Sequence, residues 1–299
     1  MNEIKLIALY SYICDCYDKN LRWYCQRFSN NNLVPEFTDQ ECLTIYLFAI
    51  MEEEKFKIKS IHTYAEKYLK SWFPKLPSYA AFNSRINFMA SALVHLVGTL
   101  IDDLDKEGVQ FDISLLDSMP IITCSGKRSG KVAPELTDKG YCSTKKLHYY
   151  GVKLHAIAFR RAGQLPLPEM FGVSPASEHD LNAVRYIFCK MFGRQIFADK
   201  AYCDKGLKSK LKNECNAILY TPVKLVKGES QLLRNFNKAA DDLFSTAVSK
   251  IRQPIESLFN WLIEKTDIQR ASKVRSAKGL MVHVFGKIAA AIASWVFNP

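Results

Sequence analysis

Apolar residues in the first hundred positions recur with the spacing of helices. Thr38 and Glu41 form a T-x-x-E capping box immediately before the apolar run at 43–50, a combination typical of a helix start. Further helices are expected over about 60–72 and, beyond the breaks at Pro74 and Pro77, over about 78–100. We therefore predict an all-helical N-terminal domain over residues 1–105; small helical domains of this kind often bind DNA or a partner subunit.

From about residue 108 the pattern changes to short apolar runs separated by glycine, proline and lysine. Strands are expected at 111–122, 149–159, 167–174, 195–198 and 217–222, and helices at 180–191, 205–213, about 239–266 and 277–297. This order describes an α/β domain with a mixed five-stranded sheet flanked by helices. We assign it residues 106–299 and interpret residues 125–146 as a long basic loop between the first two strands.

Charge is the unusual part of an otherwise ordinary composition. The 299 residues include 41 Lys and Arg but only 30 Asp and Glu, a formal net charge of +11. The first hundred residues hold 11 basic and 10 acidic side chains, so nearly all of the excess belongs to the α/β part. A polyanionic partner, most simply nucleic acid, explains this distribution, and a merely soluble basic surface is the alternative.

Cysteine usage and the chain termini favour a cytoplasmic protein. The nine cysteines form no C-x-x-C pair, which argues against a zinc ribbon and against a secreted disulfide framework. The N-terminus lacks the features of a signal peptide. Residues 280–297 are apolar enough to suggest a membrane span, but His283, Gly286 and Lys287 interrupt them, and a buried terminal helix is the preferred interpretation.

Two aspartates stand in or directly after predicted strands. Asp117 lies within the apolar run at 113–121, where an ionised carboxylate must be solvated, paired or bound to metal; alternatively it caps a turn before Pro120. Asp199 directly follows the strand at 195–198, where it either caps the turn or helix that follows or serves as a ligand. Because ligands collect at the carboxyl ends of strands in α/β sheets, the two aspartates can converge.

Glu256 is the best-placed third carboxylate. A helical apolar stripe that would pack on the sheet is formed by Ile251, Ile255, Leu258, Phe259 and Leu262. Glu256 falls about 100° from the centre of that stripe, on its flank. Pro254 either starts the helix, which puts Glu256 in its first turn, or kinks it. The alternative is a surface ion pair between Arg252 and Glu256, which contributes only about 0.3–0.5 kcal/mol.

Five segments carry a resemblance to a known family. They are LDSMPI at 116–121, YYGVKLH at 149–155, EHD at 178–180, FADKAY at 197–202 and IRQPIESLFNWL at 251–262. Together and in this order they resemble the DDE transposases of bacterial insertion sequences, most closely the 982 group. The similarity extends through nearly the whole chain, more loosely in the helical N-terminal part.

The resemblance implies an RNase H-like catalytic domain whose acidic triad is Asp117, Asp199 and Glu256. Three clustered carboxylates repel one another, and hard divalent cations relieve that repulsion, so two Mg²⁺ ions are expected, with Mn²⁺ able to substitute. The implied reaction is cleavage at the ends of the element and then strand transfer into target DNA, without a covalent protein–DNA intermediate.

The implied partners are double-stranded DNA, as terminal inverted repeats and as target, and a second copy of the chain, because two ends must be paired. A bacterial cytoplasmic location at the nucleoid follows. No membrane and no nucleotide partner is expected, since the GKRSGK at 126–131 lacks the spacing of a phosphate-binding loop.

Basic side chains near these segments are candidate DNA contacts. Arg252 suits a phosphate because its guanidinium can bind two oxygens at once, with a structural ion pair as the alternative. Contacts to the DNA backbone are expected from Lys200, Lys127, Arg128, Lys131, Lys145 and Lys146, each of which has a solvated surface position as its alternative.

The signature around Glu256 departs from that of related enzymes. Ser249 and Ile263 stand where those enzymes carry a tyrosine and a lysine, and Lys265 is the candidate substitute for that lysine. His179 and Asp180 are expected to cap the helix that follows them rather than to bind metal.

Two other functions share these features. A DNA-binding protein derived from a transposase but no longer catalytic would retain the triad. A metal-dependent nuclease on the same fold would cleave DNA without joining strands.

Overall fold

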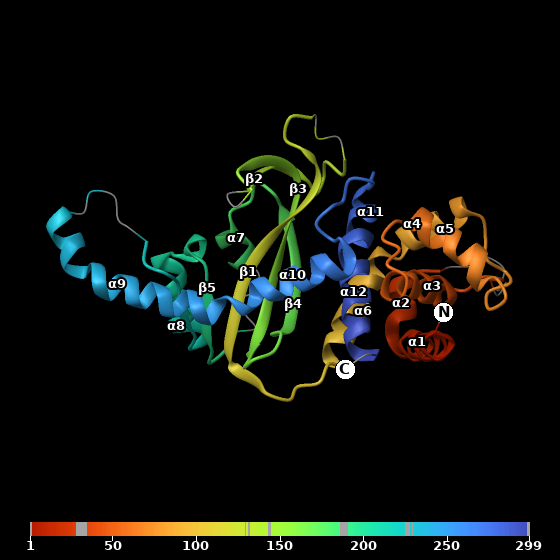
Figure 1. Ribbon diagram of the computed structural model, residues 1–299, viewed down its shortest axis with the longest axis horizontal. Coiled ribbons are helices and arrows are strands. Elements are labelled where there is room, and N and C mark those ends of the chain that lie inside the picture. The colour runs from red at the N-terminus through yellow and green to blue at the C-terminus, as the bar shows by residue number, and fades with distance from the viewer. Residues whose placement is uncertain are drawn as a thin grey trace. The chain divides into compact units, whose positions relative to one another are not determined.

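The computed structural model describes residues 2–27, 35–128, 130, 132–142, 145–185, 191–224, 228 and 230–297 (Figure 1). The chain divides into two compact units. The first comprises Met1–Asp105, Lys131–Glu135 and Leu262–Pro299, and the second comprises Lys106–Gly130 and Leu136–Trp261. The first junction, after Asp105, coincides with the expected end of the helical domain.

The described part of the first unit is helical. Its α-helices are α1 (Glu3–Cys16), α2 (Arg22–Cys25), α3 (Asp39–Met51), α4 (Ile58–Tyr64), α5 (Tyr79–Phe88), α6 (Ala90–Asp102), α11 (Ala277–Met281) and α12 (Lys287–Phe297). The π-helical turns η1 (Tyr17–Leu21), η2 (Ala65–Leu69) and η5 (Val282–Gly286) connect some of them. The predicted helices are therefore confirmed, but the helix expected at 78–100 is broken at Met89, whose ψ of 20° is not helical.

Helix α3 lies in the core of this unit. The predicted capping box is present: the Thr38 hydroxyl accepts from the Glu41 amide, and the Glu41 carboxylate accepts from the Thr38 amide. Every residue from position 42 to 50 is buried, so the helix is apolar all round, as a core helix must be. Helices α1 and α12 both pack against it.

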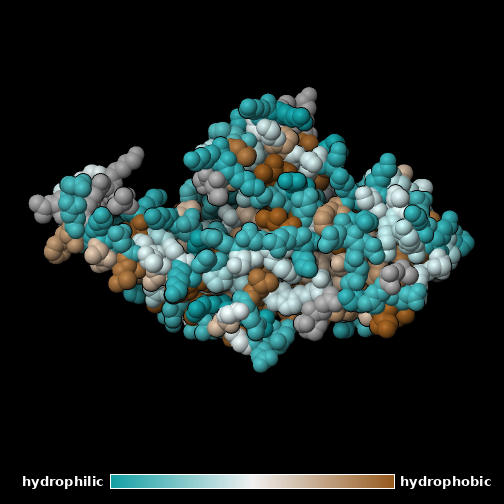
Figure 2. All heavy atoms as spheres, in the orientation of Figure 1, coloured by the Kyte–Doolittle hydropathy of each residue, from teal (hydrophilic) through white to brown (hydrophobic). Residues whose placement is uncertain are grey.

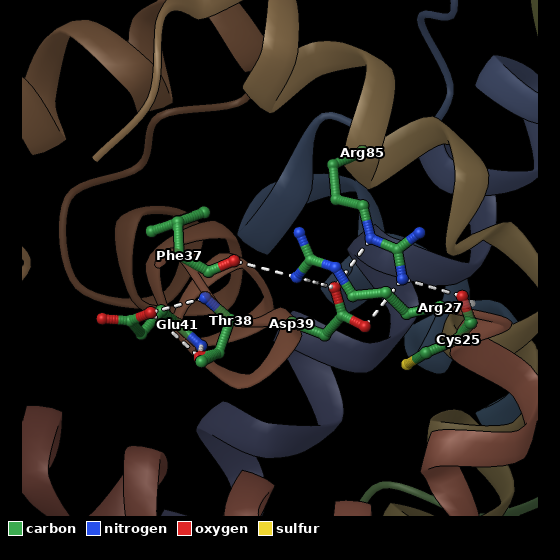
Figure 3. Close-up of polar contacts among 7 residues, drawn as sticks. All are labelled: Cys25, Arg27, Phe37, Thr38, Asp39, Glu41 and Arg85. Atoms are coloured by element: carbon green, nitrogen blue, oxygen red, sulfur yellow. Dashed lines mark hydrogen bonds and ion pairs between the residues drawn. The ribbon is translucent and has the colours of Figure 1, made fainter. Parts of the chain in front are cut away.

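A buried charge cluster fixes the start of α3 (Figure 3). The fully buried carboxylate of Asp39 accepts from Arg27 at 3.0 Å and from two nitrogens of Arg85 at 2.7 and 2.6 Å. Arg85 also donates to the Cys25 carbonyl, so the cluster joins the end of α2 to α3 and α5. An aspartate is tolerated in this core because two guanidinium groups compensate its charge.

The C-terminal helices belong to the first unit, and here the structure differs from the expected domain over 106–299. The stretch Ala277–Phe297 is long and apolar enough for a membrane span, but 67% of its most apolar window is buried. Helix α12 packs against α3 and α6. This burial agrees with the interpretation of 280–297 as a core helix, and it explains why the end of the chain groups with the N-terminal helices.

The second unit is built on a mixed six-stranded sheet. Its strands are β1 (Val109–Ser125), β2 (Asp138–Cys142), β3 (Leu147–Arg161), β4 (Leu167–Pro175), β5 (Gln195–Ala198) and β6 (Ile218–Tyr220). The order is β2-β3-β1-β5-β6, with β4 also paired to β3. β3 pairs with both β1 and β4, and both pairings are antiparallel. β5 pairs with both β1 and β6, and both pairings are parallel. This is the RNase H-like architecture.

The five-stranded prediction was wrong by one strand, β2. Its sequence DKGYC lies in the segment expected to be a loop and has no apolar alternation. β2 pairs with residues 147–151 of β3, so backbone hydrogen bonds rather than side-chain burial define it. The other five strands lie where they were predicted, and β1 and β3 extend further than expected.

Helices cover both faces of this sheet. Helix α7 (Asp180–Arg185) and α8 (Lys205–Cys215) pack with Leu116, Ile157 and Ile196 of the strands. The long helix expected at 239–266 is instead two helices, α9 (Gln231–Arg252) and α10 (Pro254–Thr266), and α9 packs on β5. Apolar side chains remain exposed on α9, among them Phe236 and Leu243, and Figure 2 shows apolar atoms along its outer part.

Candidate active site

Asp117 lies in the middle of the sheet. It is within β1, opposite Ala156 of β3, and the strand continues to Ser125, so Asp117 does not cap a turn before Pro120. Side chains of a strand alternate between faces, and Leu116 packs in the cluster with α7 and α8. Asp117 therefore points to the opposite face, the one that carries α9.

Asp199 is brought beside Asp117 by strand pairing. β1 and β5 are parallel, with Leu116 in register with Ala198, so Asp117 and Asp199 occupy the next position of neighbouring strands. Neighbouring strands lie about 4.8 Å apart. Asp199 is exposed and precedes the 3₁₀ turn η4 (Lys200–Tyr202), where it stands at the N-cap position without a capping hydrogen bond from its side chain. The capping alternative therefore does not account for its carboxylate.

The other two charged groups of the site, Arg252 and Glu256, lie on either side of a helix break at Gln253. α9 ends at Arg252 and α10 begins at Pro254, which puts Glu256 in the first turn of α10. Proline is suited to this place because the first turn of a helix does not need its missing N–H. The break leaves Arg252 and Glu256 one turn apart, with Ile255 and Leu258 buried between helix and core.

Arg252 links the carboxylates. One guanidinium nitrogen, Nη1, donates to Asp117 Oδ2, and the other, Nη2, donates to Glu256 Oε1. The exposed fractions of the side chains are 13% for Arg252, 18% for Asp117 and 52% for Glu256. The expected surface pair of Arg252 with Glu256 is therefore present, but Arg252 is largely buried and holds a second acid. Its Nε is buried without a partner among the described residues.

Burial changes the proton affinity of Asp117. Loss of solvent raises the pKa of its carboxyl to about 6, while Arg252 and the Ser118 amide oppose the rise. The negative charges of Asp199 and Glu256, which lie near Asp117, raise the pKa of Asp117 further. Asp117, Asp199 and Glu256, far apart in the sequence, thus lie together around one guanidinium.

The donor chemistry of this site suits a divalent cation. Carboxylate oxygens are the preferred ligands of Mg²⁺ and Mn²⁺, and a cation would neutralise the part of the charge of these three acids that Arg252 alone does not compensate. Within the described ranges, however, no three Asp, Glu, His or Cys side chains are arranged to hold one metal ion. Arg252 holds two of the three acids, so these side chains would have to turn from Arg252 toward a metal.

The predicted DNA contacts are scattered over the surface. Lys200 is exposed directly after Asp199, Lys127 and Arg128 are exposed in the turn after β1, and Lys145 and Lys146 are exposed between β2 and β3. Lys131 lies outside the described residues. Lys265 is exposed near the end of α10, in the part of that helix that belongs to the first unit.

A second polar cluster lies on the other face of the sheet. Lys153 of β3 forms an ion pair with Asp180 at 2.9 Å, and buried His155 bonds to the Ser174 hydroxyl at 2.8 Å. Burial lowers the pKa of His155 to about 4. No role for Lys153 or His155 was predicted, although two polar residues that alternate onto one face of a buried strand are a usable signal. His179 accepts from the Leu181 amide at the start of α7, the capping role expected of it.

Comparison with known proteins identifies the family of this second unit. Searches among curated proteins and among solved structures found no match. The transposase DDE domain family matches residues 107–276, more than half of the chain. That range contains the three clustered acids and Arg252, and it begins where the sheet begins. The chain therefore belongs to the transposase DDE domain family.

Proposed function

We propose that this protein is the transposase of an insertion sequence, of the 982 group, that cleaves the element's ends and joins them to target DNA. The observation that carries the proposal is the meeting of Asp117, Asp199 and Glu256 in a transposase DDE domain. In such phosphoryl transfer the protein forms no covalent bond to the substrate and mainly positions the reacting groups and the metal ions that stabilise their charge. A cluster of carboxylates is suited to holding such ions.

The three carboxylates would hold two Mg²⁺ ions, with Mn²⁺ able to substitute. When bound, these cations activate the attacking oxygen, from water or from a DNA 3′-hydroxyl, and stabilise the leaving oxygen. Asp117 supplies the most firmly placed oxygens, because it lies mid-strand and accepts from the Ser118 amide at 2.8 Å. Arg252, when not bonded to Asp117 and Glu256, would bind a phosphate of the DNA with two nitrogens.

Basic side chains of this chain would hold the DNA backbone. Lys200 stands beside Asp199, Lys127 and Arg128 lie in the turn after β1, and Lys145 and Lys146 lie between β2 and β3. Lys131, which is outside the described residues, is proposed as a further contact. Lys265, on α10, would also contact the DNA backbone. We place the reaction in the bacterial cytoplasm, at the nucleoid, and propose a homodimer because two DNA ends must be held together.

The test is cleavage of DNA that carries the element's terminal inverted repeats, with Mg²⁺ or Mn²⁺. We expect Asp117→Asn, Asp199→Asn and Glu256→Gln each to slow cleavage at least about 100-fold, since each removes a ligand worth several kcal/mol in the transition state. Binding of the same DNA should change little. Glu264→Gln, an exposed position on the same helix as Glu256, is the matched control.

The products distinguish the alternatives. Joined strands support a transposase, whereas cleavage without joining would identify a nuclease. Wild-type protein that binds these DNA ends but leaves them intact with both metals would identify a silent DNA-binding protein. Full cleavage by any one of the three variants would remove that residue from the site.

A further inference from the structure

Four basic side chains follow one another between the end of α10 and the start of α11 in the first unit (Figure 1). They are Arg270, Lys273, Arg275 and Lys278, and all four are exposed. We call them the basic cluster. The three acids around Arg252 belong to the second unit, so the basic cluster is a separate feature of the molecule.

The surroundings of the basic cluster are poor in acids. Residues 268–299 contain no Asp or Glu. Helices α5 and α6 both contact α11, and residues 67–101, which include α5 and nearly all of α6, contain no Asp or Glu either. Asp267 does lie beside the cluster, but its carboxylate is 4.0 Å from Arg270 Nε, and 82% of the Arg270 side chain remains exposed. Positive charge is therefore left uncompensated on this surface.

Two of the cations are held in place by neighbours that carry no charge. The Lys278 ammonium lies 4.7 Å from the ring centre of Phe88, on α5, and Phe88 is itself 44% exposed. Arg275 Nη1 donates to the carbonyls of Ser272 at 3.2 Å and Val274 at 2.8 Å. A cation that is already positioned loses less conformational freedom when it binds an anion.

The backbone at the start of this segment is anchored in the core of the unit. Ile268 is fully buried, and its carbonyl is 2.7 Å from His283 Nε2. Burial lowers the pKa of His283 to about 3, so the ring is neutral and Nε2 donates its proton to that carbonyl. The Lys287 ammonium donates to the Asp267 carbonyl at 3.0 Å. The exposed cations therefore stand on a fixed backbone.

A turn brings the cations close to one another. The Val274 amide donates to the Ala271 carbonyl at 3.1 Å, and the ends of such a turn have their Cα atoms within about 7 Å. Arg270 and Arg275 flank this turn, so their Cα atoms lie within about 15 Å, and Lys273 lies inside it. Since each DNA strand carries a phosphate for about every 3.4 Å of helix axis, the cluster can contact several phosphates of one DNA segment.

We propose that the basic cluster of the first unit binds the phosphate backbone of duplex DNA. The inference rests on the proposed function, which makes DNA the substrate. Contacts to phosphates carry no information about the bases, so this surface adds affinity and positions the DNA without reading its sequence. The helical unit thereby holds DNA, while the second unit carries the acids of the candidate active site.

The test is binding of a fluorescent duplex to the full chain, measured by anisotropy in EDTA at several salt concentrations. The variant combines Arg270→Gln, Lys273→Gln and Lys278→Gln; Arg275 stays, because it bonds to the backbone of the turn. Loss of three phosphate contacts should reduce the slope of log affinity against log salt by about 2.7. A fourfold rise in salt should therefore weaken wild-type binding about 40-fold more than binding by the variant. Lys273→Gln alone should reduce the slope by about 0.9.

A charge-matched variant on another element is the first control. Lys205→Gln, Lys208→Gln and Lys212→Gln together remove the same charge from α8, in the second unit. This variant should keep the wild-type slope, because the proposal assigns the contacts to the basic cluster and not to net charge. An equal fall in slope for both triple variants would overturn the proposal.

A charge-conserving variant is the second control. Arg270→Lys, Lys273→Arg and Lys278→Arg together should keep the wild-type slope, since the number of cations is unchanged. A reduced slope in this variant, or an unchanged slope in both Lys273→Gln and the triple Gln variant, would overturn the proposal. So would a triple Gln variant that binds DNA normally but no longer binds vesicles of phosphatidylglycerol, because the cluster would then serve a membrane surface.

The two proposals fail separately. EDTA removes the metal, so this measurement does not depend on cleavage. Protein that shows the expected slopes but never cleaves the element's ends would contradict the proposed function alone. Protein that cleaves and joins these ends while the triple Gln variant keeps the wild-type slope would contradict the role of the basic cluster alone.

Discussion

At the scale of single residues, charge compensation decides where polar groups are buried in this protein. Asp39 is buried with two arginines, and Asp117 is largely buried with one, Arg252. The difference is that Arg252 is shared with Glu256 and stands beside Asp199. The acids of the candidate active site are thus only partly compensated, which is a property suited to binding a cation.

Arg252 and a bound metal would compete for the same carboxylates. We predict that Arg252→Gln binds Mn²⁺ about tenfold more tightly, since ion-paired hydrogen bonds no longer have to be broken. Cleavage should nevertheless slow, because the phosphate contact is lost. Isothermal titration calorimetry gives the affinity, with Lys205→Gln as the control for loss of a positive charge. Weaker Mn²⁺ binding by Arg252→Gln would contradict the competition.

Lys287 predicts a pH dependence of stability. Burial lowers the pKa of its ammonium to about 8 from near 10.5, with Asp267 opposing the shift. Its Nζ donates to the Asp267 carbonyl at 3.0 Å and lies over the Phe56 ring. Between pH 8 and 10.5, Lys287 is protonated in the unfolded chain but largely neutral in the folded protein. The free energy of unfolding therefore rises with pH across that window, as far as Lys287 contributes to it.

The change that tests this is Lys287→Met. At pH 7 we expect it to stabilise the protein by about 2 kcal/mol, because the shift costs about 3 kcal/mol and the lost hydrogen bond offsets about 1 kcal/mol. The advantage should disappear by about pH 10.5. Denaturant unfolding at several pH values measures it. A difference between variant and wild type that is constant from pH 7 to 10.5 would show that the proton on Lys287 is not responsible.

At the scale of elements, close approach of backbone and side chain decides local geometry. In η5, a Cβ on Gly286 would lie 2.6 Å from the Tyr46 hydroxyl oxygen, and that hydroxyl donates to the Val282 carbonyl. In α6, a Cβ on Gly98 would meet nothing within 4 Å. Of these two helical glycines, Gly286 has no room for a side chain, whereas Gly98 has open space beside it.

These two glycines make a matched pair of substitutions. Gly286→Ala should destabilise the protein by about 1–3 kcal/mol, because the added methyl displaces buried Tyr46. Gly98→Ala should stabilise it by about 0.5–1 kcal/mol, because alanine loses less backbone freedom in a helix. Unfolding in urea measures both. Equal effects of the two changes would refute the steric explanation.

Element prediction succeeded where a side-chain pattern existed. The strand at 195–198 and the capping box of Thr38 and Glu41 were read correctly, because apolar runs and caps act locally. β2 was missed because backbone pairing with β3 defines it. The sequence does not decide whether the helix breaks at Gln253, because Pro254 is compatible with a helix start and with a kink.

At the scale of the whole molecule, the end of the chain completes the helical unit. Seven consecutive residues of α12, from Lys287 to Ala293, are buried, and the helix packs on α3 and α6. Leu262–Pro299 therefore belongs with Met1–Asp105 although the second unit separates them in sequence. Hydropathy alone gives the same signal for a membrane span and for such a core helix.

Removal of residues 277–299 should therefore unfold the helical unit. The deletion would expose the apolar surfaces of α3 and α6 that α12 covers, so we expect aggregation and loss of a cooperative unfolding transition for that unit. Circular dichroism and calorimetry of the shortened chain measure this. A shortened protein that stays monomeric and retains both transitions would show that α12 is dispensable for the core.

The sequence by itself determined the mixed α/β class, the helical character of the first hundred residues and the choice of Asp117, Asp199 and Glu256. Periodicity, caps and strand-end acids are local patterns, and they indicate the class, the helices and the two aspartates. The choice of Glu256, and of the three acids as one set, follows from the resemblance of the five segments to the DDE transposases. Their catalytic role stays a prediction. Only the tertiary structure decided that Arg252 joins Asp117 to Glu256, that β2 forms an edge strand, and that α12 packs on α3. These features depend on contacts between residues far apart in the chain, whose partners no local pattern specifies.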